Sequence, residues 1–185
     1  INAVIPSQRA LPGPLLDPKI KNRSRLHYQL ANIEVSQVEG TTNWALLLDP
    51  DGFIAEGTGD NFFIVKNGKV LTPEGRNILR GISRDYVREL CAELKLEHVE
   101  TNLESYDVHT ADEAFMTGTP FCIIPVSSLN GLPIGERPLG PVTKRLLDRW
   151  SENVGVDIVK QIRDYGKEVS ALQANAPTPY QFRKK

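Results

Sequence analysis

The stretch Asn61-Phe-Phe-Ile-Val-Lys-Asn-Gly-Lys-Val-Leu71 carries the clearest local structural signal in this chain of 185 residues. The apolar run Asn61–Lys66 predicts a buried strand. Asn67-Gly68 favours a tight hairpin turn, because both residues tolerate the positive φ angles that such a turn requires. We therefore expect the chain to reverse here and to return as a second strand over Lys69–Leu71.

Apolar runs bounded by turn residues predict further strands on both sides of this hairpin. They are expected at Trp44–Asp49, Phe53–Ala55, around Val99, at Ala114–Thr117 and at Phe121–Leu129, with turns at Asp49–Gly52 and Asn130-Gly131.

Helical periodicity predicts helices between these strands. The expected helices are Ser24–Val38, with Leu26, Leu30, Ile33 and Val38 on its apolar face; Ser83–Lys95, with Ser83 as its N-cap; Glu104–Thr110; and one from Pro141 through Ile162, where Gly155 weakens the pattern. The alternation of strands and helices predicts an α/β domain that borders on α+β.

The two ends of the chain differ from this patterned middle. Prolines at positions 6, 12, 14 and 18 mark residues 1–18 as a linker that leads into the domain, with its first residues able to form a strand. Residues 19–170 are expected to form the domain, and residues 171–185 lack periodicity and predict a mobile tail. The chain begins with Ile1 rather than Met, which favours a fragment of a longer protein.

The composition excludes several classes of function. Lys and Arg total 22 and Asp and Glu total 23, so the net charge of −1 lacks the basic excess of a nucleic-acid-binding protein. The longest uncharged stretch, Ala114–Gly135, contains prolines and glycines and is a poor membrane span, so no membrane partner is expected. Cys91 and Cys122 show no disulfide or metal spacing, which favours buried thiols in a reducing, cytoplasmic compartment and no metal site.

Several segments carry residues that could take part in chemistry, although each is ordinary when taken alone. Lys19 and Lys21 precede the first predicted helix, where lysines are usually solvated. Glu56 ends a strand in a glycine-bearing loop, where a carboxylate either forms a turn or belongs to a site. Gly81-Ile82-Ser83 opens a helix whose free N–H groups could bind an anion. Thr117-Gly118-Thr119 is either a second phosphate contact or a turn.

Taken together and in order, these segments resemble the class IV aminotransferases, the fold-type IV pyridoxal-phosphate enzymes. That family includes branched-chain and D-amino acid aminotransferases and aminodeoxychorismate lyase. The matching stretches run in family order over about residues 15–165 and are Ile20-Lys-Asn22, Glu56-Gly-Thr-Gly-Asp-Asn-Phe62, Leu79-Arg-Gly-Ile-Ser-Arg-Asp85, Ala111-Asp-Glu-Ala-Phe-Met-Thr-Gly-Thr119, Ile124-Pro-Val126 and Gly140-Pro-Val-Thr-Lys144.

The resemblance implies a fold and an assembly. Residues 19–170 would form the pyridoxal-phosphate-binding large domain, a pseudo-barrel like that of the D-amino acid aminotransferases. The family's smaller N-terminal domain would be absent from this chain. The family usually forms homodimers with the active site near the interface, so a homodimer is implied here too.

The resemblance also implies roles for two charged residues. Lys21 matches the lysine that holds the cofactor aldehyde as a Schiff base and then moves a proton between the substrate Cα and the cofactor. Lys19 is two residues too early for this role. Glu56 matches the glutamate that keeps the pyridine nitrogen protonated, so that the ring can accept electrons.

The phosphate end of the cofactor is matched by two loops. The backbone amides of Ile82 and Ser83, with the Ser83 hydroxyl, match the family's phosphate cup at the start of a helix. Thr119, together with the amide of Gly118, matches the second phosphate contact.

The implied activity is transfer of an amino group between an amino acid and a 2-oxo acid. The alternatives are a lyase that uses the same cofactor and a non-catalytic relative that keeps the fold as a binding module. Thr119 favours transamination, because the lyases tend to have asparagine there. Leu26 stands where branched-chain members have a tyrosine, and Pro120 has no N–H to hold a substrate carboxylate, so both depart from the branched-chain pattern.

Overall fold

The hairpin around Asn67-Gly68 forms as the sequence predicts. The computed structural model describes residues 1–40 and 42–175 and pairs strand β4 (Asn61–Lys66) antiparallel with strand β5 (Lys69–Pro73). Asn67 and Gly68 have φ angles of 52° and 75°, as the turn requires. The prediction of a hairpin at this position is therefore confirmed.

Strand β4 is also the branch point of the sheet. It pairs antiparallel with β3 (Ile54–Gly57) at one end and with β7 (Glu113–Gly118) along most of its length. With β5, strand β4 therefore has three neighbours, and β7 continues through a turn into β8 (Cys122–Val126), which pairs with β7. Within the described ranges the branched sheet has ten strands.

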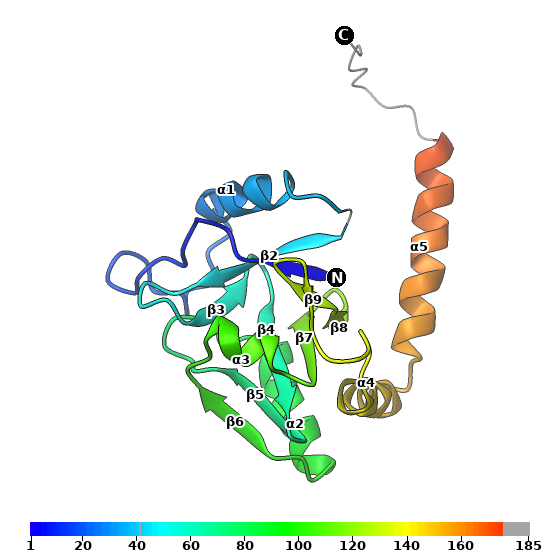
Figure 1. Ribbon diagram of the computed structural model, residues 1–185. Helices are drawn as coiled ribbons and strands as arrows, with labels where there is room; N and C mark the ends of the chain where they lie inside the picture. The colour runs from blue at the N-terminus through cyan, green and yellow to red at the C-terminus, as the bar shows by residue number, and fades with distance from the viewer. Residues whose placement is uncertain (41, 176–185) are drawn as a thin grey trace.

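The remaining strands extend this sheet in both directions (Figure 1). Strand β2 (Asn43–Leu48) pairs antiparallel with β3. Strand β1 (Asn2–Val4) lies parallel to β2 and to the short β9 (Ser128–Leu129). Strand β10 (Leu132–Pro133) pairs with β9, and β6 (His98–Thr101) lies parallel to β5. The first residues of the predicted linker are thus part of the sheet.

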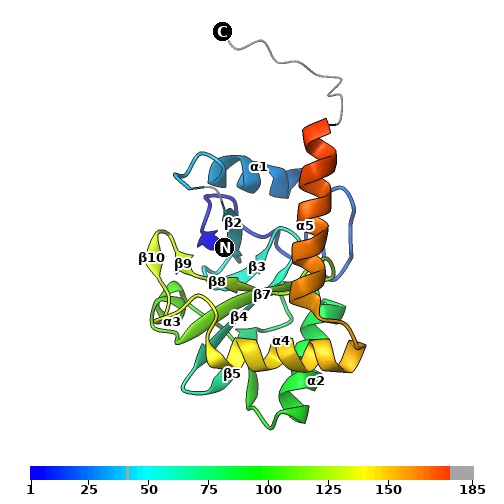
Figure 2. The same cartoon turned by 90° about the vertical axis from the view of Figure 1, so that its right-hand side faces the viewer.

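Five helices lie around the sheet in the part of the chain that the structure describes (Figures 1 and 2). They are α1 (Leu26–Val35), α2 (Ile82–Glu93), α3 (Ser105–His109), α4 (Pro141–Val154) and α5 (Ile158–Asn175). No helix in that part is long and apolar enough to cross a membrane.

The single helix predicted from Pro141 through Ile162 is wrong, because the chain forms two helices there. Gly155 adopts a left-handed φ of 67° and ends α4, and α5 begins at Ile158 in a new direction. In Figure 1, α5 stands clear of the sheet. It continues to Asn175, so five residues of the predicted tail are helical, and residues 176–185 of that tail lie outside the described residues.

The apolar face predicted for the first helix is also wrong. Leu26, Leu30 and Ile33 are 80%, 59% and 52% exposed. The buried residues of α1 are instead Tyr28, Ala31 and Val35. Small Ala31 packs in the same buried cluster as residues of β2, because a residue with no side chain beyond Cβ allows the helix to approach the strand closely.

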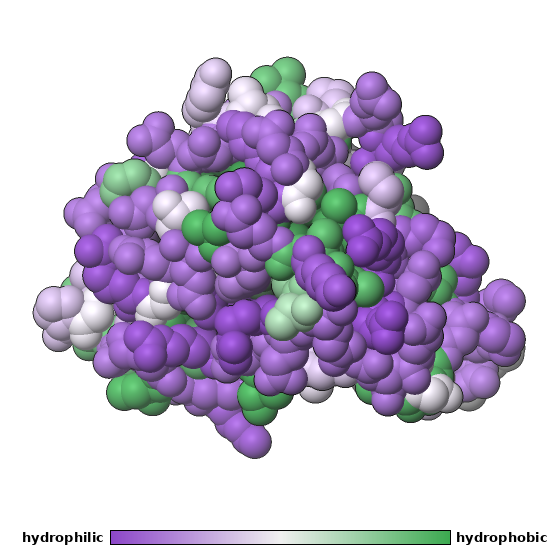
Figure 3. Space-filling view, turned by 90° about the horizontal axis from the view of Figure 1, so that it is seen from below, coloured by the Kyte–Doolittle hydropathy of each residue, from purple (hydrophilic) through white to green (hydrophobic). Residues whose placement is uncertain are grey.

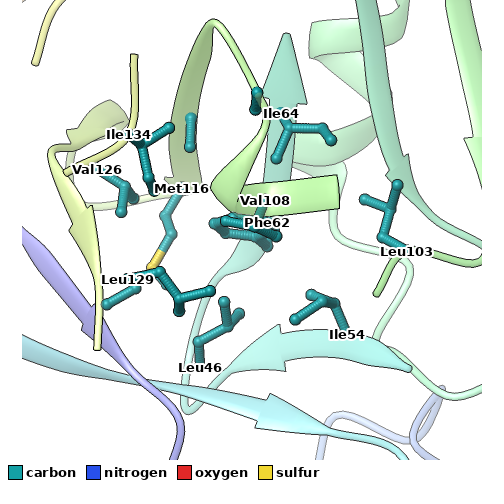
Figure 4. Packing of buried hydrophobic residues seen from close by; sticks show 13 residues of the cluster. Leu46, Ile54, Phe62, Ile64, Leu103, Val108, Met116, Val126, Leu129 and Ile134 are labelled. Carbon is teal, nitrogen blue, oxygen red and sulfur yellow. The ribbon is translucent and has the colours of Figure 1, made fainter. Parts of the chain in front are cut away.

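Two hydrophobic cores lie on opposite faces of β4, since successive residues of a strand point to opposite sides. Phe62 packs with Leu46, Met116 and Leu129 in the cluster shown in Figure 4. Phe63 points the other way and stacks on Phe115 with ring centroids 4.8 Å apart, against α2 and α4. The continuous apolar run of β4 therefore reflects burial on both faces.

Viewed from below, the surface of the molecule is mostly hydrophilic, with small apolar patches (Figure 3).

A buried carboxylate joins β7 to α4. Glu113 is 3% exposed, and its carboxylate oxygens accept hydrogen bonds from the backbone N–H groups of Val142 (2.9 Å) and Thr143 (2.7 Å). A Cβ at Gly140 would collide with this side chain. The motifs around residues 113 and 140 are thus two halves of one helix cap.

Replacing Glu113 with alanine should lower the free energy of unfolding by about 2 kcal/mol, because two N–H groups at the start of α4 lose their acceptor. Urea denaturation followed by circular dichroism measures this loss. Glu136→Ala, at an exposed position in the loop before α4, is the matched control and should change little. Equal stability of the two variants would contradict the capping role.

Candidate functional site

A cavity of about 270 Å³ lies where β3, β7 and the start of α2 meet. All six residues singled out from the sequence line it, and they are Lys21, Glu56, Ile82, Ser83, Gly118 and Thr119. They come from four separate segments of the chain. The cavity therefore brings together an amine, a carboxylate, a helix N-terminus and a hydroxyl-bearing turn.

Strand register explains why residues so distant in the sequence meet here. Asn61, the first residue of β4, pairs with Glu56 of β3 on one side and with Thr117 of β7 on the other. Gly118 is the last residue of β7, and Thr119 begins the turn that follows it. The end of β3 and the end of β7 are therefore held at the same edge of the sheet.

Glu56 is the buried acid of the cavity, with 4% of its surface exposed. Its Oε2 atom accepts hydrogen bonds from the backbone N–H of Leu79 (2.9 Å) and from Nδ2 of Asn61 (3.2 Å). Burial raises the pKa of Glu56 to about 8, although the Leu79 N–H and the nearby charges of Arg25 and Lys21 act to lower it. A cation placed beside this carboxyl would favour its ionised form.

Lys21 lies in the loop between residues 17–20 and α1, and its side chain is exposed at the cavity. It is close enough to Glu56 to lower the pKa of that carboxyl. Lys19 is placed differently: its Nζ atom pairs with Oδ1 of Asp17 at 2.7 Å, and it is not among the residues that line this cavity. Lys21 therefore lies at the cavity and Lys19 does not, which agrees with the distinction drawn between them from the sequence.

The helix α2 begins earlier than expected. Gly81 is its N-cap, with φ −69° and ψ 142°, and no side chain of the described ranges caps it, so the prediction of Ser83 as N-cap is wrong. A Cβ at residue 81 would collide with Oδ1 of Asn61, and this close approach explains why glycine stands there. The first amide groups of a helix have no acceptor within the helix, so those of Ile82 and Ser83 can bind an anion.

The second predicted phosphate contact lies at the turn between β7 and β8. Gly118 is buried at the end of β7, and Thr119 is exposed at the cavity. The hydroxyl of Thr117 donates a 2.6 Å hydrogen bond to the carbonyl oxygen of Cys122, which closes the turn. A Cβ at Gly118 would meet the Phe121 ring at 3.0 Å, so the turn packs tightly at this residue.

Sequence reasoning missed Arg25, Asp60, Asn61 and Arg80, which line the same cavity. Arg25 donates hydrogen bonds to the carbonyl oxygens of Asn22 (3.2 Å) and Thr58 (2.6 Å), and it lines the cavity, whereas its neighbour Leu26 is exposed. The place of Arg25 soon after Lys21, near the start of the predicted helix, was the available signal. Burial raises the pKa of Asp60 to about 7, and its buried Oδ1 atom has no hydrogen-bond partner among the residues that the structure describes.

The fold and this cavity together define a class of protein. Residues 1–129 match the family model of the class IV amino-transferases, and the chain belongs to that family. The mixed α/β architecture with its large sheet is that of fold-type IV aminotransferase structures.

Three relatives show how closely the chain follows the family. The branched-chain amino acid aminotransferase from Thermobaculum terrenum in its PLP form has a TM-score of 0.79 and 35% identity, covering 83% of this chain and 50% of that one. The branched-chain amino acid aminotransferase from Escherichia coli has a TM-score of 0.73 and 35% identity, covering 81% of this chain and 51% of that one. A Methanocaldococcus jannaschii relative, named as a putative branched-chain-amino-acid aminotransferase, is 42% identical over 153 residues, 82% of this chain and 52% of that protein. The chain thus spans about half the length of these relatives.

The free energy of unfolding of the purified chain should fall as the pH rises from about 5 to about 8. The pKa of Glu56 is raised from its ordinary 4.5 to about 8, so the folded chain keeps a proton that the unfolded chain releases, and rising pH favours unfolding. Glu56→Gln should reduce this slope, with Asp60 keeping part of it.

Thermal denaturation at a series of pH values measures this effect. Glu34→Gln is the control, because the pKa of exposed Glu34 is lowered by its hydrogen bonds with Ser7 and gives the opposite sign. Identical pH dependence in the wild-type and Glu56→Gln chains would show that burial of Glu56 does not have the stated consequence.

Proposed function

We propose that the whole protein is a pyridoxal-phosphate-dependent aminotransferase that moves an amino group between an amino acid and a 2-oxo acid. The observation that supports this most directly is the convergence of Lys21, Glu56 and the N-terminus of α2 on one cavity. Each matches one part of the cofactor: the aldehyde, the ring nitrogen and the phosphate. The names of the solved relatives, which include cofactor-bound forms, support the same assignment.

The donor set of the cavity fits this cofactor chemically. Within the part of the chain that the structure describes, both donors to Glu56 bind Oε2, so Oε1 is the atom available to a protonated ring nitrogen. The backbone amides of Ile82 and Ser83 offer donors and the positive end of a helix dipole to a phosphate. Gly118 and Thr119 complete that end of the cavity.

The residues of the chain would divide the reaction between them. When bound, pyridoxal phosphate supplies a ring that accepts the electrons released as the substrate Cα–H bond breaks. Lys21 would hold the cofactor through its aldehyde carbon, and its Nζ amine, when free, would carry the proton between the substrate Cα and the cofactor side. Ionised Glu56 would hold the proton on the ring nitrogen.

Branched-chain amino acids are the first substrates to test, because the relatives are named for them. Pro120 has no N–H and is exposed beside Thr119, so a substrate carboxylate must find its donor elsewhere. Substrate choice therefore rests on other groups around the cavity.

Lys21→Ala should abolish covalent capture of the cofactor and leave the fold intact, because Lys21 is exposed and carries the only amine assigned to the aldehyde. The measurement is borohydride reduction of the protein incubated with pyridoxal phosphate, followed by mass spectrometry of the peptides. Wild type should gain the cofactor mass on Lys21, and the matched control Lys19→Ala should do the same.

The result also separates the alternatives. A wild-type protein that binds no cofactor favours a non-catalytic relative, and labelling of Lys19 in place of Lys21 contradicts the assignment. Release of pyruvate from aminodeoxychorismate, without amino transfer to a 2-oxo acid, favours the lyase.

We further propose that the whole protein forms a homodimer, as the resemblance implies. The exposed apolar side chains of Leu26, Leu30 and Ile33 on α1 support this, since such a row is a surface suited to association. Analytical ultracentrifugation should give twice the monomer mass, and a monomer over a wide concentration range would contradict the proposal.

We also propose that the protein is located in the cytoplasm, where the free thiols of Cys91 and Cys122 stay reduced. Cell fractionation tests this location.

A further inference from the structure

The side chain of Asn61 lies between the two ends of the cavity. Asn61 is 5% exposed, and its Nδ2 atom lies 3.2 Å from Oε2 of Glu56 and 2.8 Å from the carbonyl oxygen of Leu79. Leu79 in turn donates its own N–H to the same Oε2 atom at 2.9 Å. The three residues thus form a closed hydrogen-bonded set.

The chemistry of the partners fixes the orientation of the Asn61 amide. Both partners of Asn61 are acceptors, so the nitrogen rather than the oxygen must face them. The NH₂ group has two hydrogens, and these two contacts use both. The other end of the amide, Oδ1, fills the place that a Cβ at Gly81 would need.

The contact with Leu79 extends this set to the helix that offers its amides to a phosphate. The carbonyl oxygen of Leu79 also accepts the N–H of Gly81 at 2.9 Å, and Gly81 is the N-cap of α2. The amide of Asn61 therefore contacts both the buried carboxyl and the backbone turn that sets the start of α2.

We propose that Asn61 is a positioning residue that holds Glu56 and the start of α2 at a fixed separation, so that one ligand can reach both. This inference rests on the proposed function, because it takes pyridoxal phosphate as that ligand. Two donors on Oε2 restrain rotation of the Glu56 carboxyl group and leave Oε1 to the ring nitrogen. The hydrogen bond to the Leu79 carbonyl keeps the turn from drifting away from β4.

The test uses two variants of Asn61 and a matched control. Asn61→Ala removes the amide, and Asn61→Leu keeps a similar shape and removes both donors without adding a charge beside Glu56. Asn77→Ala removes a comparable amide–carboxylate contact, Nδ2 of Asn77 to Oδ2 of Asp49 at 2.8 Å, at a pair that does not line this cavity.

Binding of pyridoxal phosphate should weaken about tenfold in both Asn61 variants and change little in Asn77→Ala. The loss should shrink for pyridoxal, which lacks the phosphate, and for the 1-deaza analogue, which lacks the ring nitrogen. A shared loss of equal size for all three ligands would indicate general loosening of the cavity, and wild-type affinity in both variants would equally overturn the inference.

A second readout needs no cofactor. Carbon-13 NMR titration of the Glu56 carboxyl should show a pKa that is higher in both Asn61 variants than in the wild type, because a donor to the charged form is lost. The charges that face this carboxyl, Arg25, Lys21 and Asp60, stay in place in the variants. An unchanged Glu56 titration overturns the positioning role, whereas a wild-type chain that fails to bind pyridoxal phosphate overturns only the proposed function.

Discussion

The pairing of one residue with two strands is the constraint on which the rest of the structure depends. Asn61 lies opposite Glu56 on β3 and opposite Thr117 on β7, at the point where the sheet branches. A shift of either pairing by one residue would turn the carboxyl or the hydroxyl-bearing turn to the other face of the sheet. Phe62 and Phe63 resist such a shift, because each is buried in a different core on its own side of β4.

The same strand pairing holds the carboxyl group of Glu56 in a buried position, where its ionised form is unfavourable. Burial raises the pKa of Glu56 to about 8 and that of Asp60 to about 7, so ionising either group in the cavity is unfavourable. A protonated ring nitrogen beside Glu56 would reverse this preference, and the same low exposure that penalises a lone carboxylate strengthens its interaction with a cation. Both donors to Glu56 from the described residues bind Oε2, so Oε1 would be the oxygen that faces such a cation.

The sequence predicted the fold where the signal was local and failed where packing decided. Asn67-Gly68 needed only its own backbone preferences to form the hairpin. The buried face of α1 depended on β2, which accepts the small Ala31 and leaves Leu30 in solvent, and helical spacing alone could not show this. Ser83 resembles an N-cap by residue type, but the N-cap of α2 is Gly81, where the side chain of Asn61 leaves no room for a Cβ.

The site was predictable to the extent that each residue carries a distinct chemistry. An amine at Lys21 and a carboxylate at Glu56 can be matched to an aldehyde and a ring nitrogen from residue type and order. Arg25 and Asn61 line the same cavity but act on other residues, and their partners are backbone carbonyls and a carboxyl that only the folded register brings near. Residues that would contact a ligand can therefore be predicted from sequence, because their side-chain chemistry matches that of the ligand. Residues that position them cannot, because their role depends on which residues become neighbours in the folded chain.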